Sequence, residues 1–407
     1  MPVRRERLPG LTPRGRALAA AGLTVLLCSA VLGIPQLVRV GVLLLALPAL
    51  AWVFIGVRRR QVSATRLVAQ PVVAAGTTCG IELIVSGGRR RGETLAGEET
   101  LPFALGDRPR FVIDSNEPAE RITYDVRSEV RGRFALGPLR TRTSDPFGLV
   151  EVRATVPGTA AITVTPPIVP LPVISLGSGR SGTGERQSPA VAAGSAEDVT
   201  VREYRRGDDL RRIHWRSSAR VGDLMVRREE HPWEARVTVL LDNRASAHRG
   251  HGRGSSLESA VTVAASIAVH LDRHGYAVRL VTADGSATSG TESVLPLLEH
   301  LAVVGLSPRT DLPVAGITGP QGHGTVIGVF GLLEGTDSRP LRSLRRQTDN
   351  AVAVALDAYR WEHRNAAPSE ANSLVLRELG WRSATLGPAD RIEQVWQSVT
   401  SRDGGRR

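Results

Sequence analysis

Two long runs of apolar residues occupy most of the first sixty positions. They extend over residues 17–34 and 40–57, and each would form a helix about 27 Å long at about 1.5 Å per residue, close to the thickness of a bilayer core. Only residues 35–39 separate them, and such a short connection forces the helices to run antiparallel. We therefore expect residues 1–60 to form an N-terminal segment followed by a two-helix transmembrane hairpin.

The arginines around these runs predict which side of the membrane the chain ends face. They are Arg4, Arg5, Arg7, Arg14 and Arg16 before the first run, Arg58, Arg59 and Arg60 after the second, and Arg39 between the runs. Because basic residues stay on the cytoplasmic side, both termini and the soluble domains are expected there, at the inner membrane. The alternative is a cleaved signal peptide followed by one anchor, but no small-residue cleavage site follows Ile34.

The next hundred residues alternate between apolar and polar positions in short stretches. Examples are "CGIELIVSG", "RITYDVRSEV" and "AAITVTP", separated by Gly, Pro and Asp turn signals. This pattern is typical of strands, so residues 62–172 are expected to form a β-sandwich. Residues 173–197 are rich in Gly, Ser and Ala and predict a flexible loop, because they carry too few large apolar side chains to form a core.

From residue 233 to about 400, apolar strands alternate with longer amphipathic segments. The strands are predicted in "ARVTVLLDN", "AVRLVTADG", "TVIGVFGLL" and "AVAVALDAY", and helices include residues 339–346, 369–379 and 389–398. Such alternation predicts an α/β domain with a parallel sheet. Ligands of these sheets lie at the carboxyl ends of the strands, where Asp242 and Asp284 fall. Asp284 fits the turn "TADGS".

Composition changes this picture little. All 52 basic residues are arginine and the net charge is +12, but a lysine-free chain points first to codon bias, so no nucleic-acid partner is expected. Cys28 and Cys79 have neither a disulfide-framework nor a metal-ligand spacing, which fits a reducing compartment.

Asp242 is the strongest candidate for a metal ligand. It follows the strand "VTVLL" and resembles the first residue of the D-x-S-x-S metal site of the von Willebrand factor A family. Ser246 and Thr310 match further positions of that site, which implies Mg²⁺ or Mn²⁺. Arg244, however, stands at the first serine position, and the strand "TVIGVFGLL" offers no distal aspartate. The alternative is that Asp242 caps a turn or pairs with Arg244.

Residues 198–232 form an arginine-rich segment before the α/β domain. A helix is expected to begin at Asp208 and Asp209 and to continue through "DDLRRIHWRSSAR". The segment either joins two domains, or grips phosphates and bases, or supplies acids, bases or metal ligands. Its candidate residues are Arg202, Glu203, Tyr204, Gly207, Asp208, Asp209, Arg212, His214, Trp215 and Arg220.

Two runs carry a resemblance to a known family. They are "REYRRGDDLRRIHWRSSARVGDLMVRREE" and "GRFALGPLRTRTSDPFGLVEV", which are similar to segments of the domain of unknown function 58 family. That resemblance implies a membrane-anchored protein with a von Willebrand factor A-like domain, and a partner role beside a MoxR-type AAA+ ATPase in assembly or metal insertion.

The leading functional hypothesis is an interaction protein that docks such an ATPase and is not an enzyme. It rests on the sequence having no G-x-S-x-G, H-E-x-x-H or P-loop motif. The alternative is a metal-dependent hydrolase that uses Asp242, Asp208, Asp209 and His214. A third hypothesis is that arginines contact anionic lipids or nucleic acid.

Overall fold

The computed structural model describes most of the chain in two compact units, residues 1–167 and 168–407. The described residues are 10–57, 62–87, 94–114, 119–173, 201–203, 213, 215–227, 236–290, 293–312, 314, 317, 324–363 and 365–400. Each unit is considered by itself.

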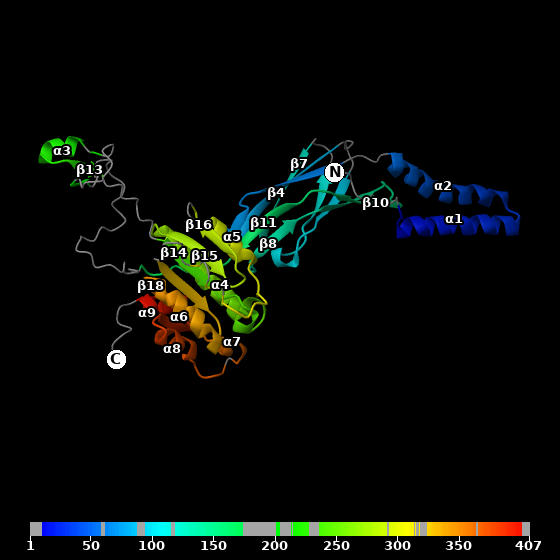
Figure 1. Ribbon diagram of the computed structural model, residues 1–407. Helices are drawn as coiled ribbons and strands as arrows, with labels where there is room; N and C mark the ends of the chain where they lie inside the picture. Colours follow the sequence, from blue (N-terminus) through cyan, green and yellow to red (C-terminus); the bar gives the residue numbers. More distant parts are fainter. Residues whose placement is uncertain are drawn as a thin grey trace. The chain divides into compact units, whose positions relative to one another are not determined.

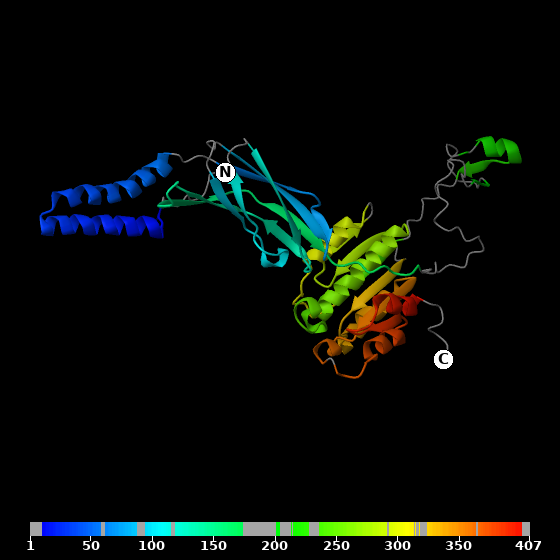
Figure 2. The ribbon, with the colours of Figure 1, turned by 180° about the vertical axis from the view of Figure 1, so that it is seen from behind.

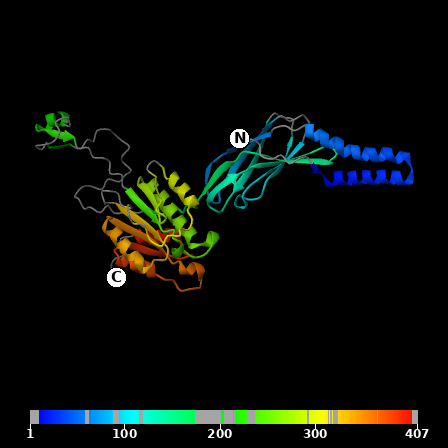
Figure 3. The ribbon, with the colours of Figure 1, turned by 45° about the vertical axis from the view of Figure 1, so that its right-hand side comes forward.

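The first unit begins with a pair of antiparallel helices, α1 (Pro13–Leu32) and α2 (Pro35–Val57), which lie side by side in Figures 1 and 3. Thr12 caps α1 by accepting a hydrogen bond from the Gly15 amide, and Gly33 ends it with φ 66°. Both helices are long and apolar enough to cross a membrane. The pair of apolar helices was therefore predicted correctly, but the expected loop 35–39 is helical.

The hairpin packs on strand β10 (Val150–Val156), which pairs with the short strand β1 (Gly10–Leu11). Ala51 and Ile55 of α2 form a small buried cluster with Leu149 and Val150. Gly15 lies so close to this strand that a Cβ there would be 2.1 Å from the Leu149 carbonyl oxygen. The glycine therefore permits the contact between helix and strand.

The rest of the first unit consists of three sheets. The strands are β2 (Val62–Val68), β3 (Val72–Ala74), β4 (Thr78–Gly87), β5 (Thr94–Glu99), β6 (Arg110–Asp114), β7 (Ala119–Arg127), β8 (Gly132–Leu136), β9 (Leu139–Ser144) and β11 (Ala160–Thr165). They are ordered β2-β4-β7, β3-β11-β8 and β1-β10-β9-β5-β6. Alternate residues of β4 enter two cores, Cys79 and Ile81 in one and Leu83 and Val85 in the other. The period-2 pattern thus places one face of β4 against both neighbouring sheets.

The second unit is built on a six-stranded sheet. Its strands are β14 (Arg236–Leu241), β15 (Ala277–Thr282), β16 (Ala287–Gly290), β17 (Thr325–Phe330), β18 (Asn350–Leu356) and β19 (Arg382–Leu386). The order is β16-β15-β14-β17-β18-β19, with β16 antiparallel and the other strands parallel. In chain order this reads 3-2-1-4-5-6, so the direction of winding reverses between β14 and β17.

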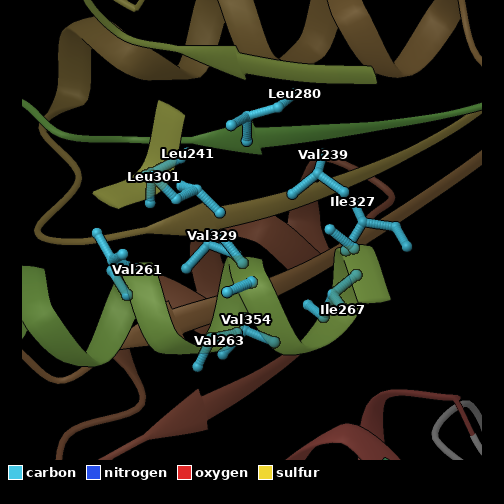
Figure 4. Close-up of a cluster of buried hydrophobic side chains, with 14 of the residues drawn as sticks. Val239, Leu241, Val261, Val263, Ile267, Leu280, Leu301, Ile327, Val329 and Val354 are labelled. Atoms are coloured by element: carbon cyan, nitrogen blue, oxygen red, sulfur yellow. The ribbon is translucent and has the colours of Figure 1, made fainter. Parts of the chain in front are cut away.

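Helices cover both faces of this sheet. On one face lie α4 (Ser256–Arg273), α5 (Leu295–Val303) and α9 (Ile392–Thr400), and on the other α6 (Ser338–Arg346) and α8 (Ala371–Glu378). Figure 2 shows α4 along the sheet, and Figure 4 shows Val261 and Ile267 of α4 facing Val329 and Val239. Side chains of β14 alternate between the two faces, with Val239 in one core and Leu240 in the other. The unit therefore has three layers.

The four strands and three helices predicted for this unit are present, with ends shifted by a few residues. The strands β16 and β19 were not predicted from the sequence pattern. The structure also contains a short α7 (Tyr359–Glu362) and the one-turn helices η1 (Phe103–Leu105) in the first unit and η4 (Ala245–Ala247), η5 (Gly252–Gly254) and η6 (Gly335–Asp337) in the second.

The arginine-rich segment contains β12 (Val201–Glu203), α3 (Trp215–Val221) and β13 (Met225–Arg227), with β12 and β13 antiparallel. Ile213 forms a β-bridge, so the expectation of one continuous helix from Asp208 was wrong. The helix begins only at Trp215. The Gly/Ser-rich residues 174–197 lie outside the described part of the chain.

Candidate functional site

The candidate site lies where the winding of the second sheet reverses. Asp242 is the first residue after β14, and its amide donates to the Val329 carbonyl of β17 at 2.9 Å. The loops after β14 and β17 therefore leave the sheet side by side. Open α/β sheets bind ligands at this position.

Arg244 fills this position with its guanidinium group. Its Nε and Nη2 donate to the two carboxylate oxygens of Asp242 at 2.9 and 3.0 Å. Its Nη1 and Nη2 donate to the two oxygens of Asp337 at 2.9 and 3.0 Å, and Nη1 also donates to the Thr310 carbonyl at 2.9 Å. A guanidinium carries five N–H donors, so each donor has an acceptor.

The three side chains are buried together. Asp242 is 0% exposed, Arg244 1% and Asp337 2%. Burial alone would lower the pKa of Arg244, but its hydrogen bonds to Asp242 and Asp337 and the negative charges of these carboxylates raise the pKa above its ordinary value. Arg244 is therefore a fixed positive charge between two carboxylates.

Asn243 ties the same loop to its other neighbours. Its Oδ1 accepts from the Ala283 amide after β15, and its Nδ2 donates to the Gly305 carbonyl, both at 2.8 Å. The backbone of Arg244 pairs with Ser307 in a parallel bridge. One loop thus connects the carboxyl end of β15, the segment after α5 and β17.

His248 fixes the loop to the start of α4. Its Nε2 lies 2.5 Å from the Asp242 carbonyl and its Nδ1 lies 3.0 Å from the Ser256 hydroxyl. Because a carbonyl only accepts, Nε2 carries the proton of the neutral ring. Burial is the main reason that the pKa of His248 is lowered.

The loops after β17 and β18 are held by Asn372 of α8. Its Nδ2 donates to the Gly331 carbonyl at 3.1 Å and to the Leu356 carbonyl at 3.3 Å. Gly331 also lies against the first loop, since a Cβ there would be 2.2 Å from the Ala247 carbonyl oxygen. The carboxyl ends of β14, β15, β17 and β18 are therefore connected by polar side chains, of which Asn243 is buried and Asn372 half-buried.

Exposed side chains of these loops form what we call the carboxyl-edge surface. They are Ala245, Ser246, Leu306, Pro308, Arg309, Glu334 and Tyr359. Leu306 is 55% exposed and Tyr359 56%, and the Tyr359 ring stacks on His363 at 4.2 Å between centroids. Arg309 donates to the Asp284 carbonyl at 3.1 Å. A fixed, mixed polar and apolar surface of this kind suits protein contact.

The predicted metal ligands do not surround an open cation position. Mg²⁺ and Mn²⁺ take about six oxygen ligands, whereas all four carboxylate oxygens of Asp242 and Asp337 accept from Arg244. Ser246 is exposed, and Thr310 contributes its backbone carbonyl to Arg244. Within the described residues no group of three or more His, Cys, Asp or Glu is arranged to hold a metal. The residues as placed therefore do not fit a divalent cation.

Most candidate residues of the arginine-rich segment cannot be placed in this site. Tyr204, Gly207, Asp208, Asp209, Arg212 and His214 lie outside the described residues. Arg202 and Glu203 belong to β12, Trp215 is 69% exposed at the start of α3, and Arg220 lies in its last turn. Ser218 of α3 accepts from the Met225 amide at 2.8 Å, which joins the helix to β13.

Asp284 forms the turn that its sequence predicted. Its Oδ1 accepts from the Ser286 amide at 2.9 Å and from the hydroxyls of Thr282 and Ser286, both at 2.6 Å. Burial would raise its pKa, but these hydrogen bonds lower it overall. Asp284 therefore shapes the loop after β15.

Asp337 is the site residue that the sequence analysis missed. It lies in η6 after β17, beyond the strand where a distal aspartate was sought, and it accepts from the Glu334 amide at 2.9 Å. An acidic residue three positions after Glu334, the spacing of the capping box that the two residues form at η6, was the signal that could have drawn attention to it. Its partner Arg244 lies 93 positions earlier in the sequence, so local spacing gives no sign of the contact.

Comparisons with known proteins support one family. A model of the family described as protein of unknown function DUF58 matches residues 200–349, which supports DUF58 as the family of this region. No curated protein matches the chain.

Solved structures resemble parts of the chain only weakly. The CARDB domain of the PF1109 protein from Pyrococcus furiosus, solved in complex with di-metal ions, is 10% identical with a TM-score of 0.19, and the match covers 26% of this chain and 93% of that domain. A beta-glucosidase from Listeria innocua is 12% identical with a TM-score of 0.15 over 24% of this chain and 16% of the enzyme. The sporulation control protein Spo0M from Bacillus subtilis is 11% identical with a TM-score of 0.13 over 26% of this chain and 49% of that protein.

Proposed function

We propose, from the DUF58 match over residues 200–349, that this chain is a membrane-anchored interaction protein. In this proposal the helix hairpin spans the inner membrane, the strands of the first unit form a β-sandwich, and the second unit is a von Willebrand factor A-like domain on the cytoplasmic side. A MoxR-type AAA+ ATPase is the proposed partner. The carboxyl-edge surface of the second unit is where it would bind.

The observation that carries the proposal is the way this surface is fixed from beneath. Arg244, Asn243, His248 and Asn372 connect its loops through buried and half-buried hydrogen bonds. A surface held in one arrangement loses little conformational entropy when a partner binds. Exposed Leu306 and Tyr359 provide apolar contact area within it.

Other features support the remaining parts of the proposal. The A-like assignment rests on the 3-2-1-4-5-6 strand order with Asp242 at the reversal. The sandwich assignment rests on β4 supplying residues to two cores shared with the neighbouring sheets. The cytoplasmic orientation rests on the arginines that flank the hairpin.

The geometry favours docking over the hydrolase hypothesis. That hypothesis needs Asp242 as a metal ligand or base, but both its carboxylate oxygens accept from Arg244 and the side chain is 0% exposed. A carboxylate in this position has no access to a substrate. Asp242 instead belongs to the support of the carboxyl-edge surface.

Affinity capture of the tagged full-length protein from crosslinked native membranes tests the proposal. We expect a MoxR-type AAA+ ATPase to be enriched, and we expect Leu306→Asp to reduce its recovery at least tenfold because a buried charge opposes contact. Mass spectrometry with an added reference peptide of the ATPase measures recovery.

Leu374→Asp provides the matched control. Leu374 is 51% exposed on α8, close to the 55% of Leu306, but lies outside the carboxyl-edge surface. Its substitution is expected to leave recovery unchanged. Equal recovery with both variants would place the contact elsewhere, and failure to enrich any AAA+ ATPase would remove the proposed partner.

A further inference from the structure

We infer that Arg244 is a permanent internal cation of the sheet's switch point, where it replaces a divalent metal ion and makes the second unit independent of metals. The inference concerns the chain's own loops and does not require the proposed partner. It rests on the contacts of one guanidinium group with two carboxylates from separate loops.

The donor set of Arg244 is complete. The guanidinium binds Asp242 and Asp337 with two hydrogen bonds each and the Thr310 carbonyl with one, all between 2.9 and 3.0 Å. Planar bidentate pairs of this kind are among the strongest and most directional ion contacts in proteins. No carboxylate oxygen of the pair is left to bind a metal alone.

Charge leads to the same conclusion. Two buried carboxylates facing one another would repel strongly in a low-dielectric interior, so a positive charge must lie between them. The guanidinium supplies it from within the chain, since Arg244 is only 1% exposed. A divalent ion entering beside it would face that charge at close range.

The other neighbours of the site match this role. The backbone of Asp242 accepts from His248 Nε2, and the Arg244 amide donates to Asp242 Oδ1 at 3.1 Å. The loop is thus folded around the guanidinium by its own backbone. Asp337 is held from its other side by the Glu334 amide. These loops keep one arrangement whether or not divalent ions are present.

A single substitution would remove the guanidinium and restore the sequence pattern of a metal site. Residues 242–246 read "DNRAS", so Arg244→Ser turns them into a D-x-S-x-S pattern and removes the guanidinium. The variant would leave the Asp242 and Asp337 carboxylates without their cation and would put a hydroxyl at position 244 in place of the guanidinium. These are oxygen ligands that suit Mg²⁺ or Mn²⁺.

The test compares the wild type with Arg244→Ser as purified full-length proteins in detergent. Mn²⁺ binding is measured by electron paramagnetic resonance, and thermal unfolding is followed through the tryptophan fluorescence of Trp381 and Trp396, both buried in the second unit. We expect the wild type to bind no Mn²⁺ at this site and its Tm to be the same in EDTA and in Mn²⁺. Arg244→Ser should have a lower Tm in EDTA. At Mn²⁺ about 100-fold above its dissociation constant, its Tm should rise by about 5–10 °C.

A second variant keeps the result unambiguous. Arg244→Ser combined with Asp337→Asn should lose the Mn²⁺ response, because it lacks one of the two carboxylates. One Mn²⁺ bound by the wild type and lost in Asp242→Asn would overturn the inference. So would a folded Arg244→Ser that binds no Mn²⁺. If Arg244→Ser does not fold in either buffer, the wild-type titration and its Asp242→Asn control still decide the question.

Discussion

Asp337 binds the guanidinium of Arg244 with both carboxylate oxygens, at 2.9 and 3.0 Å, across 93 positions of sequence. Arg244 belongs to the loop after β14, and Asp337 to the one-turn helix that follows β17. The pair therefore joins the two loops between which the winding of the sheet reverses. Its removal should affect the second unit more than the loss of any surface ion pair.

Asp337→Asn is expected to destabilise the second unit by about 3–5 kcal/mol, because it leaves a buried guanidinium with one carboxylate partner. The amide nitrogen that replaces the second oxygen also cannot accept from Arg244 Nη1, as Asp337 Oδ1 does. Hydrogen–deuterium exchange of the full-length protein, read at the amides of β14 and β17, measures the change.

The exposed pair between Arg377 and Glu370 is the control. Its nitrogen and oxygen are 2.7 Å apart, but the side chains are 43% and 62% exposed, and such pairs contribute less than about 1 kcal/mol. Glu370→Gln should therefore leave exchange nearly unchanged. Equal effects of the two variants would show that Asp337 contributes no more than a surface residue.

His270 should make the second unit less stable in mild acid. It is 7% exposed on α4. The centroid of its ring lies 4.3 Å from the ring centroid of His274 and 6.1 Å from that of Trp396 on α9. Burial is the main cause of its lowered pKa, and the positive charges of His274 and Arg273 add to it. The unfolded residue, with a pKa near about 6.5, takes up a proton first as the pH falls. The free energy of unfolding therefore keeps its full value above about pH 6.5 and decreases as the pH falls towards the pKa of His270 in the folded protein.

His270→Gln should reduce the loss of stability between about pH 6.5 and pH 5, measured by urea unfolding through tryptophan fluorescence. His251→Gln is the matched control, since His251 is an exposed histidine of the same unit. It should leave the pH dependence as it is in the wild type. A profile for His270→Gln that coincides with the wild type would contradict the prediction.

The buried parallel strands could be read from the sequence, whereas the edge strands could not. The strand β18 is buried at nearly every position, and its continuous apolar run "AVAVAL" is typical of the interior of a parallel sheet. In contrast, β16 reads "ATSG" and β19 reads "RSATL". Each lies at an edge of the sheet, and its pairing depends on a neighbour already in place, which local pattern does not report.

The helix ends were set by local chemistry that the apolar runs did not reveal. The first run begins at residue 17, but α1 begins at Pro13 because Thr12 caps it and proline fits the first turn. The second run begins at residue 40, yet α2 starts at Pro35, because the fixed φ of proline suits the first turn of a helix. Hydropathy locates the apolar part of a helix and not its caps.

The candidate site was only half predictable. Asp242 was found because it follows a buried strand, and a contact with Arg244 was among the alternatives. Asp337 and the Thr310 carbonyl became partners of Arg244 only through the fold. Side chains that meet across a sheet reversal share no spacing in sequence.

The orientation of the hairpin gives a prediction about access from outside the cell. Ile34, which is 41% exposed at the turn between α1 and α2, should face the outside if both termini are cytoplasmic. In a Cys28→Ser background, Ile34→Cys should therefore react with a membrane-impermeant maleimide in intact cells whose outer barriers are permeable to it. Glu378→Cys, at an exposed position of α8, should react only after the membrane is opened. The reverse pattern would invert the proposed topology.

A buried ion pair in the first unit gives a prediction that separates charge from packing. Arg66 Nε lies 2.6 Å and Nη2 lies 3.1 Å from the two oxygens of Glu99, and Nη1 donates to the Gly158 carbonyl at 2.9 Å. The side chains are 1% and 0% exposed. Burial and the Glu99 charge also raise the pKa of nearby Tyr124 above its ordinary range.

Glu99→Gln should destabilise the first unit by about 3–5 kcal/mol, since it leaves the Arg66 charge buried without a counter-charge. The double variant Arg66→Leu with Glu99→Leu should recover most of this loss, because apolar side chains of similar volume need no counter-charge. Hydrogen–deuterium exchange at the amides of β2 and β5 measures these changes, and the single variants Arg66→Leu and Glu99→Leu complete the double-mutant cycle. Glu129→Gln, in a pair with Arg127 whose side chains are 42% and 60% exposed, should change exchange little. A double variant as unstable as the sum of its single variants would mean that Arg66 and Glu99 stabilise the unit through separate contacts and not through their charges.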